Sequence, residues 1–295
     1  MGQYSIEPLF LKSSGETLGA DFYRPAKVRK PAVIIMAHGF AGERKFSLPD
    51  TATAFAEAGY AVILFDYRGF GGSTGKPREL VSAPNHVADW KAVLGQVKKR
   101  KDVDTSRIVL WGMSMSGGHV ITTAAREKGI AAIIGLVPHV DGFASAMMYP
   151  KHLLPRATAL ALQDLAGSKI GRDPVRIPVV AEQGVRCLTG DDCYEGYMQM
   201  VPKGSSWVGL VPARIIITIN QYRPTKEAAR VPCPALIFAA QEDSLIPLSA
   251  TRKAAAKIKQ VEYLEWPIGH FDLLQGRWFE EGIRVQLAFL KKHIG

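Results

Sequence analysis

The chain has 295 residues, of which 47% are hydrophobic and 22% charged, and its formal net charge is +10. These values are ordinary for a globular protein and exclude a mainly disordered chain or a coiled coil. No apolar run approaches the roughly 18 residues that span a bilayer, and residues 1–15 lack the pattern of a secretory signal. We therefore expect a cytoplasmic protein with no membrane span.

The first half of the sequence alternates between strand and helix patterns. Residues 5–11 and 17–23, separated by a Ser-Ser-Gly-Glu turn, predict an antiparallel hairpin at a sheet edge. Continuous apolar runs that follow are typical of strands buried on both faces. The predicted strands cover residues 32–37, 61–65, 108–111 and 130–137, with helices over 49–58, 84–99 and 117–127. This order predicts a mostly parallel sheet with helices on both faces.

The alternation stops between residues 138 and 232 and then resumes. A structureless loop of that length is uncommon inside a compact domain, so we expect a mainly helical cap that is inserted into the core. The α/β core would then consist of residues 1–137 and 233–295. Its last part contains predicted strands at 235–240 and 261–266 and predicted helices at 248–259 and 279–293.

The distribution of basic and aromatic residues argues against a nucleic-acid partner. The basic residues are spread along the chain, and the one dense run, residues 98–101, falls at a predicted helix end where cations complement the helix dipole. We find no basic face with base-stacking aromatics, so no nucleic-acid partner is expected.

Cys187, Cys193 and Cys233 form no metal-binding pattern and are expected to be reduced, although a disulfide between Cys187 and Cys193 is an alternative.

The most informative motif is Gly-Met-Ser-Met-Ser-Gly at residues 112–117, between a predicted strand and a predicted helix. A sharp turn from strand to helix needs small residues two positions before and after its apex, and Gly112 and Ser116 meet that need around Ser114. The turn exposes the apex hydroxyl and directs the next N–H, that of Met115, toward the same space. Ser114 is therefore the predicted nucleophile.

A serine nucleophile needs a base, and the base needs an acid that orients it. Asp243 and His270 each follow a predicted strand of the second half, at the carboxyl edge where ligands bind in open α/β sheets. We predict them as acid and base. Asp243 could instead serve only as a turn former, in which case Asp141 is the replacement acid, and His270 could be a structural histidine.

The third requirement is a pair of N–H donors for the charge that develops on the carbonyl oxygen. His38, Gly39 and Phe40 follow the first buried strand, and the N–H of Phe40 would join that of Met115 in this oxyanion hole. A plain strand-ending turn is the alternative for these residues. Chemistry of this kind needs neither a metal nor an organic cofactor, and we expect none.

These motifs in this order make the chain similar to α/β-hydrolase fold serine hydrolases over nearly its whole length. Within that superfamily it resembles the dienelactone-hydrolase-like and peptidase/esterase-like branch. The segment Val-Pro-His-Val-Asp-Gly at residues 137–142 looks like members associated with polyketide pathways. The family carries its acid after the seventh strand and its histidine after the eighth, which match Asp243 and His270, and it places a pocket-shaping cap where residues 138–232 lie.

The resemblance implies acyl transfer to and from Ser114 through an acyl-enzyme. The preferred hypothesis is hydrolysis of an ester, thioester or amide of a small apolar acyl substrate. An acyltransferase with the same triad is the alternative, and a non-catalytic ligand-binding module is the third hypothesis. His38, Met147, Met148, Tyr149 and Trp207 are candidate pocket residues, although the last four could equally form the cap's own core. The oligomeric state stays open, with a homodimer as one option.

Overall fold

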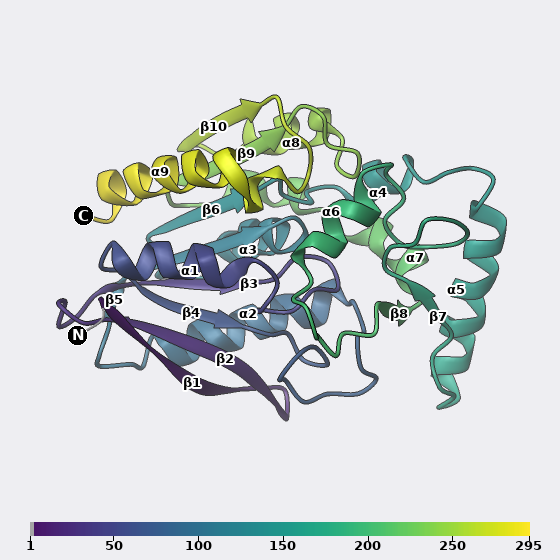
Figure 1. The fold of residues 1–295 in the computed structure, drawn as a ribbon, viewed down its shortest axis with the longest axis horizontal. Coiled ribbons are helices and arrows are strands. Elements are labelled where there is room, and N and C mark those ends of the chain that lie inside the picture. Colours follow the sequence, from purple (N-terminus) through teal and green to yellow (C-terminus); the bar gives the residue numbers. More distant parts are fainter. Residues whose placement is uncertain (1–2) are drawn as a thin grey trace.

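A single eight-stranded sheet organises the chain in a computed structural model that describes residues 3–295 (Figure 1). The strand order is β1-β2-β4-β3-β5-β6-β9-β10. The pairs β1–β2 and β2–β4 are antiparallel, and the remaining pairs are parallel. The strands are β1 (Tyr4–Ser13), β2 (Glu16–Pro25), β3 (Ala32–Ala37), β4 (Ala61–Phe65), β5 (Asp104–Met113), β6 (Ala132–Leu136), β9 (Ala235–Ala240) and β10 (Val261–Trp266). The predicted α/β fold with an N-terminal hairpin is confirmed.

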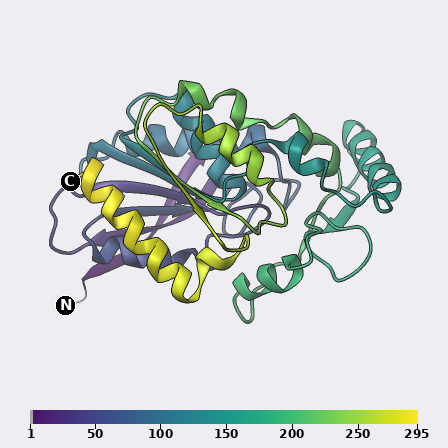
Figure 2. The same ribbon diagram turned by 90° about the horizontal axis from the view of Figure 1, so that it is seen from above.

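Helices cover both faces of this sheet, as Figure 2 shows for α9 and α8. Helices α1 (Leu48–Glu57) and α9 (Gly276–His293) pack on one face, and α2 (Ala83–Val97), α3 (Met115–Arg126) and α8 (Leu248–Ala255) pack on the other. Because successive strand residues point to opposite faces, each apolar run feeds both core layers. Every residue of β3, β4, β6 and β9 is buried.

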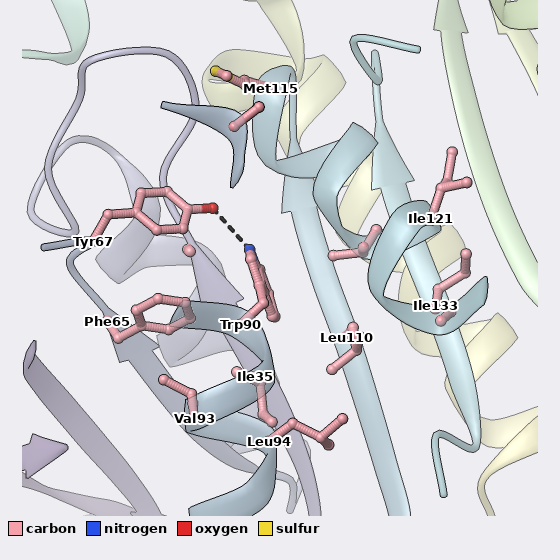
Figure 3. Close-up of a cluster of buried hydrophobic side chains, with 14 of the residues drawn as sticks. Ile35, Phe65, Tyr67, Trp90, Val93, Leu94, Leu110, Met115, Ile121 and Ile133 are labelled. Atoms are coloured by element: carbon pink, nitrogen blue, oxygen red, sulfur yellow. Dashed lines mark hydrogen bonds between the residues drawn. The ribbon is translucent and has the colours of Figure 1, made fainter. Parts of the chain in front are cut away.

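One core layer lies between α2, α3 and the strands beneath them (Figure 3). Trp90 of α2 is fully buried and packs edge-on against Phe65, with ring centroids 5.2 Å apart. Its indole N–H donates to the Tyr67 hydroxyl at 2.8 Å, so the one polar atom of the ring is satisfied. Tyr67 in turn meets the Ser116 hydroxyl at 2.9 Å, which ties this core layer to the turn that carries Ser114.

The predicted element bounds differ from the observed ones mainly at polar strand ends. β5 begins at Asp104, four residues before the predicted start, because Asp104 pairs with Ala32 and its polar neighbours continue the strand beyond the buried run. Helix α3 begins directly after Ser114, two residues before the predicted start at 117. Apolar periodicity cannot mark these ends, because residues 104–107 are polar and not buried, and the buried first turn of α3 consists mostly of serine and glycine.

Residues between β6 and β9 form a separate set of short elements beyond the carboxyl ends of the parallel strands. They comprise α4 (Gly142–Ala146), α5 (Leu154–Lys169), β7 (Arg176–Pro178), α6 (Cys193–Met200), β8 (Leu210–Pro212), α7 (Ile215–Thr218) and three short 3-10 helices, with β7 and β8 paired antiparallel. We call this stretch the inserted segment. Helix α5 lies at its outer edge, far from both chain termini (Figure 1).

A buried carboxylate joins the parts of the inserted segment. Asp164 of α5 accepts hydrogen bonds from the guanidinium of Arg214, at 2.6 and 2.9 Å, and from the backbone N–H groups of Arg214 and Val175. Four donors compensate for burying this charge. Across residues 3–295, no helix combines the length and apolarity that crossing a membrane requires.

Candidate functional site

Ser114 occupies the sharp turn between β5 and α3 with φ 54° and ψ −122°, a backbone conformation that non-glycine residues rarely adopt. Its N–H donates to Leu136 O at 2.8 Å, and its carbonyl accepts from His139 N at 2.8 Å. These bonds to the segment after β6 hold the turn from both sides. A Cβ at Gly112 would overlap the backbone of Ser116, so this turn needs glycine there.

His270 and Asp243 come from the loops after β10 and β9 and meet Ser114 above the sheet. His270 Nε2 lies 3.0 Å from Ser114 Oγ, and His270 Nδ1 lies 2.8 Å from Asp243 Oδ2. The side chains of His270 and Asp243 are each only 3% exposed. Because an ionised carboxylate can only accept, Asp243 selects the tautomer with the proton on Nδ1 and leaves Nε2 free to accept from Ser114.

The second oxygen of Asp243 is also used. Asp243 Oδ1 accepts the backbone N–H groups of Leu245 and Ile246 at 2.9 and 2.8 Å, which fixes the plane of the carboxylate. The alternative acid, Asp141, is engaged elsewhere: its carboxylate caps α4 and forms an ion pair with Arg223 at 2.7 Å. The geometry thus joins His270 to Asp243 rather than to Asp141.

The two N–H groups predicted for an oxyanion hole lie beside Ser114. Met115 is the first residue of α3, where the N–H has no acceptor within the helix. Within residues 3–295, the N–H of Phe40 has no hydrogen-bond acceptor either. A Cβ at Gly39 would lie 3.3 Å from the Ser114 Cβ, so the Phe40 loop approaches the serine very closely.

Two side chains of the inserted segment hold the Phe40 loop, and sequence reasoning did not assign them this role. Tyr197 of α6 donates its hydroxyl proton to Phe40 O at 2.8 Å, and Trp207 donates its indole N–H to Ala41 O at 3.0 Å. The two rings stack with centroids 5.2 Å apart. Tyr197 is buried, and burial raises the pKa of its hydroxyl well above the usual value, so the hydroxyl stays a donor.

A large apolar chamber opens on one side of Ser114, with about 860 Å³ of space including its mouth. Its walls come from the inserted segment and from the loop after Asp243. They include Met148, Tyr149, Leu154, Leu188, Ile215, Ile216 and Ile219, with Leu245 and Ile246 from the core. The isoleucines belong to the largely apolar stretch at residues 215–219, a signal that the sequence analysis did not use.

A smaller chamber, with about 460 Å³ of space including its mouth, also borders Ser114. Its walls are mostly aromatic or aliphatic side chains from the Phe40 loop, α6 and the segment that follows His270. They include Phe46, Leu48, Tyr197, Met200, Phe271 and Leu274. Phe40, Ser114 and Leu188 border both chambers, so the serine is accessible from each of them.

The five candidate pocket residues have different surroundings. Met148 and Tyr149 line the large chamber, and His38 lines the small one. Met147 is 70% exposed and borders neither chamber, because its side chain points away to solvent from the end of α4. Trp207 also lies outside both walls, since its indole packs on Tyr197 and holds the Ala41 carbonyl.

Three buried histidines and the partly exposed His139 lie around the site without contacting Ser114 Oγ. Burial lowers the pKa of His38, and burial together with neighbouring histidines lowers that of His86 well below the usual value. Burial and His139 lower the pKa of His119 to about 3, and burial and His270 lower that of His139 to about 4. These rings are therefore neutral at physiological pH; His86 and His119 lie in the core, whereas His38 and His139 border the chambers.

None of the three cysteines contacts Ser114, His270 or Asp243, although Cys187 borders the large chamber. Cys187, Cys193 and Cys233 are all free thiols, and burial raises the pKa of Cys193 and of Cys233 to about 11. In the part of the chain that the structure describes, no group of three or more His, Cys, Asp or Glu side chains is placed to hold a metal ion.

Comparison with known proteins places this geometry in a family. The family model described as "Serine aminopeptidase, S33" matches residues 29–177. The quorum-quenching protein AidA of Acinetobacter baumannii (strain MDR-ZJ06) is 36% identical over 92% of this chain and 90% of its own length. Polyketide transferase af380 of Aspergillus fumigatus is 26% identical over 92% of both chains, which agrees with the resemblance to polyketide-associated members.

Among solved structures, the α/β hydrolase GrgF from Penicillium sp. sh18 superposes with a TM-score of 0.84 at 25% identity and covers 98% of this chain and 99% of its own. The likeness extends over the sheet and the inserted segment alike, because almost the whole of both chains is aligned. The chain belongs to the serine aminopeptidase S33 family of α/β-hydrolase enzymes.

Proposed function

We propose that this chain is a serine esterase that cleaves uncharged esters of small apolar acyl groups through Ser114, His270 and Asp243. The observation that carries the proposal is the unbroken hydrogen-bonded series from Ser114 Oγ to His270 and on to Asp243, at 3.0 and 2.8 Å. Hydrogen-bonded nucleophile, base and orienting acid form the recurring geometry of acyl transfer.

The reaction follows from these positions. Ser114 Oγ attacks the ester carbonyl while its proton passes to His270 Nε2, and Asp243 stabilises the imidazolium through the Nδ1 proton. The N–H groups of Phe40 and Met115 stabilise the oxyanion, where one donor typically contributes on the order of 100- to 1000-fold to the rate. His270 then protonates the leaving alcohol, and water resolves the acyl-enzyme by the same steps in reverse.

The chamber walls favour an uncharged substrate over a peptide with a free amino terminus. None of the residues that border either chamber is Asp, Glu, Lys or Arg. An α-ammonium group that enters such walls loses its hydration and finds no carboxylate to replace it, which is costly. An ester with apolar groups avoids that cost and gains from burial at about 25 cal/mol per Å² of apolar surface.

Acyl transfer to an alcohol is the second candidate function. It is favoured by the similarity to a protein named polyketide transferase and by the second chamber beside Ser114. The residues that form the acyl-enzyme would be the same. Water and an alcohol would then compete for one intermediate, and exclusion of water would decide the product.

Turnover of p-nitrophenyl esters with acyl chains of two to twelve carbons tests the esterase proposal. We expect a burst of p-nitrophenol, because an activated ester acylates the serine faster than water removes the acyl group, and a preference among chain lengths that reflects the large chamber. The Ser114→Ala variant is the matched control. Burst and turnover in the control equal to those of the wild type would overturn the proposal.

A further inference from the structure

The two chambers beside Ser114 differ in one respect that bears on chemistry. His270 borders the small chamber and does not border the large one. Met115 shows the opposite distribution, since it borders only the large chamber. Of the groups around Ser114, His270 is therefore confined to the side of the small chamber, whereas Phe40 borders both chambers.

This difference determines how an ester substrate is oriented beside Ser114. In the breakdown of the tetrahedral intermediate, the imidazolium must lie within hydrogen-bond reach of the atom that leaves, about 2.6–3.2 Å. The leaving oxygen is therefore on the side of His270. The acyl chain, which stays attached to the carbonyl carbon, must extend to the other side. We propose, on the basis of the proposed esterase function, that the small chamber binds the alcohol part of the ester and the large chamber binds the acyl part.

The walls of the small chamber indicate the class of alcohol. Phe46, Leu48, Met200 and Leu274 are apolar, and Tyr197 has its hydroxyl engaged by Phe40 O. With apolar walls and no carboxylate, ammonium or guanidinium on its border, the chamber suits a compact, uncharged, largely aliphatic alcohol. It is poorly suited to a thiol that carries phosphate groups, because no cation on its border would meet them.

The same chamber accommodates the second half of the reaction. After the alcohol leaves, a new alcohol or a water molecule in this space gives its proton to His270 Nε2 and forms a bond to the acyl carbon. The bond from that carbon to Ser114 Oγ breaks, and Ser114 recovers its proton from His270. No oxidant, reductant or further group is needed, since one C–O bond forms as another breaks.

Two substitutions that fill one chamber each test the assignment. Met200→Trp fills the small chamber and Ile216→Trp fills the large one; both native side chains are partly exposed, so a larger ring can be accommodated at either. The substrates are methyl to hexyl esters of butyric acid, which vary the alcohol, and methyl esters of two- to twelve-carbon acids, which vary the acyl group.

We expect Met200→Trp to lower kcat/KM for hexyl relative to methyl butyrate by about tenfold or more, the size of effect that one or two methylene groups have in an apolar pocket. Its preference among methyl esters of different acids should stay unchanged. Ile216→Trp should lower kcat/KM for methyl esters of long acids relative to those of short acids and leave the preference among butyrate esters unchanged. If Met200→Trp instead shortens the acyl limit, or if both variants change both series equally, the assignment is overturned.

A second measurement, the ratio of two products, does not depend on how much of a variant protein is folded and active. With p-nitrophenyl butyrate and added butanol, the ratio of butyl butyrate to butyric acid reports how the acyl-enzyme partitions between butanol and water. Met200→Trp should lower this ratio several-fold and Ile216→Trp should leave it as in the wild type; an unchanged ratio in Met200→Trp would contradict the proposal. Failure of the esterase function itself is distinguished by a wild-type protein that neither forms p-nitrophenol nor reacts at Ser114 with a fluorophosphonate.

Discussion

The loops of the core and the inserted segment contribute to the site in different ways. The core supplies the reacting groups: Ser114, His270 and Asp243 follow β5, β10 and β9, and their side chains contact one another directly. The inserted segment supplies most of the large chamber's apolar wall and two hydrogen bonds to the Phe40 loop. The core thus sets the proposed chemistry, and the inserted segment sets what can reach it.

The two regions also meet through one helix. Tyr197 of α6 reaches the Phe40 loop, and a Cβ on the neighbouring Gly196 would overlap the ring of Phe271, which adjoins His270. Helix α6 therefore packs against loops from both ends of the core sequence. The division between chemistry and selectivity is not complete, and substitutions on either side should reveal how far it extends.

The largest effect is expected from Ser114→Ala, which removes the reacting oxygen of the core. In a comparable triad, loss of the nucleophile reduces kcat on the order of 10⁶-fold. The melting temperature should not fall, because no side-chain cap or core contact of the fold depends on this hydroxyl apart from His270. Ester turnover that persists in the purified variant would contradict the role of the core.

The second-largest loss of activity is expected from Asp243→Asn. The amide can present its N–H₂ group to His270 Nδ1 and favour the wrong tautomer, which costs on the order of 10⁴-fold in kcat for a triad of this kind. Asp141→Asn is the matched control, since Asp141 pairs with Arg223 instead. A steady-state assay in which the control is the damaged variant would transfer the acid role to Asp141.

Much of the core's contribution could be predicted from sequence, whereas the walls could not. The turn around Ser114 requires small residues at fixed offsets, and residues such as Gly39 and His270 follow the ends of predicted strands, so local patterns predicted which groups share one sheet edge. The walls depend on how the inserted segment folds back. Trp207 and Met147 share the apolar character of wall residues such as Ile216, and sequence alone cannot distinguish a wall residue from one that packs on Ala41 or faces solvent.

The Tyr197→Phe variant tests the hydrogen bond by which α6 holds the Phe40 loop of the core. Losing the hydroxyl frees the carbonyl of Phe40, and the resulting freedom of an oxyanion donor should lower kcat about tenfold, less than outright loss of a donor. KM and acyl-chain preference should change little, because the ring remains. Tyr194→Phe, on the same helix but 39% exposed, is the matched control. If both variants behave alike in kcat, α6 does not act through the Phe40 loop.

The smallest predicted effect concerns stability in acid. His119 and His139 are neutral in the folded protein down to about pH 3 and pH 4, whereas the unfolded chain protonates them near pH 6.5. The unfolded state therefore binds more protons in this interval, and the free energy of unfolding should fall with decreasing pH by about 1.4 kcal/mol per pH unit for each histidine.

Urea unfolding at pH 7.5, 6 and 5 measures this dependence, with His119→Gln as the comparison. The variant lacks one titrating ring, so its free energy of unfolding should decline less steeply, by about 1.4 kcal/mol per pH unit near pH 5. Equal slopes for both proteins would show that His119 does not stay neutral when folded.

The central claim is that Ser114 is the nucleophile activated by His270. Reaction of the purified protein with a fluorophosphonate, mapped by peptide mass spectrometry, tests it most directly, because the reagent needs an activated serine and no particular ester. We predict a single adduct on Ser114 that is lost in His270→Ala. Absence of an adduct, an adduct on another serine, or equally fast labelling of His270→Ala would contradict the account.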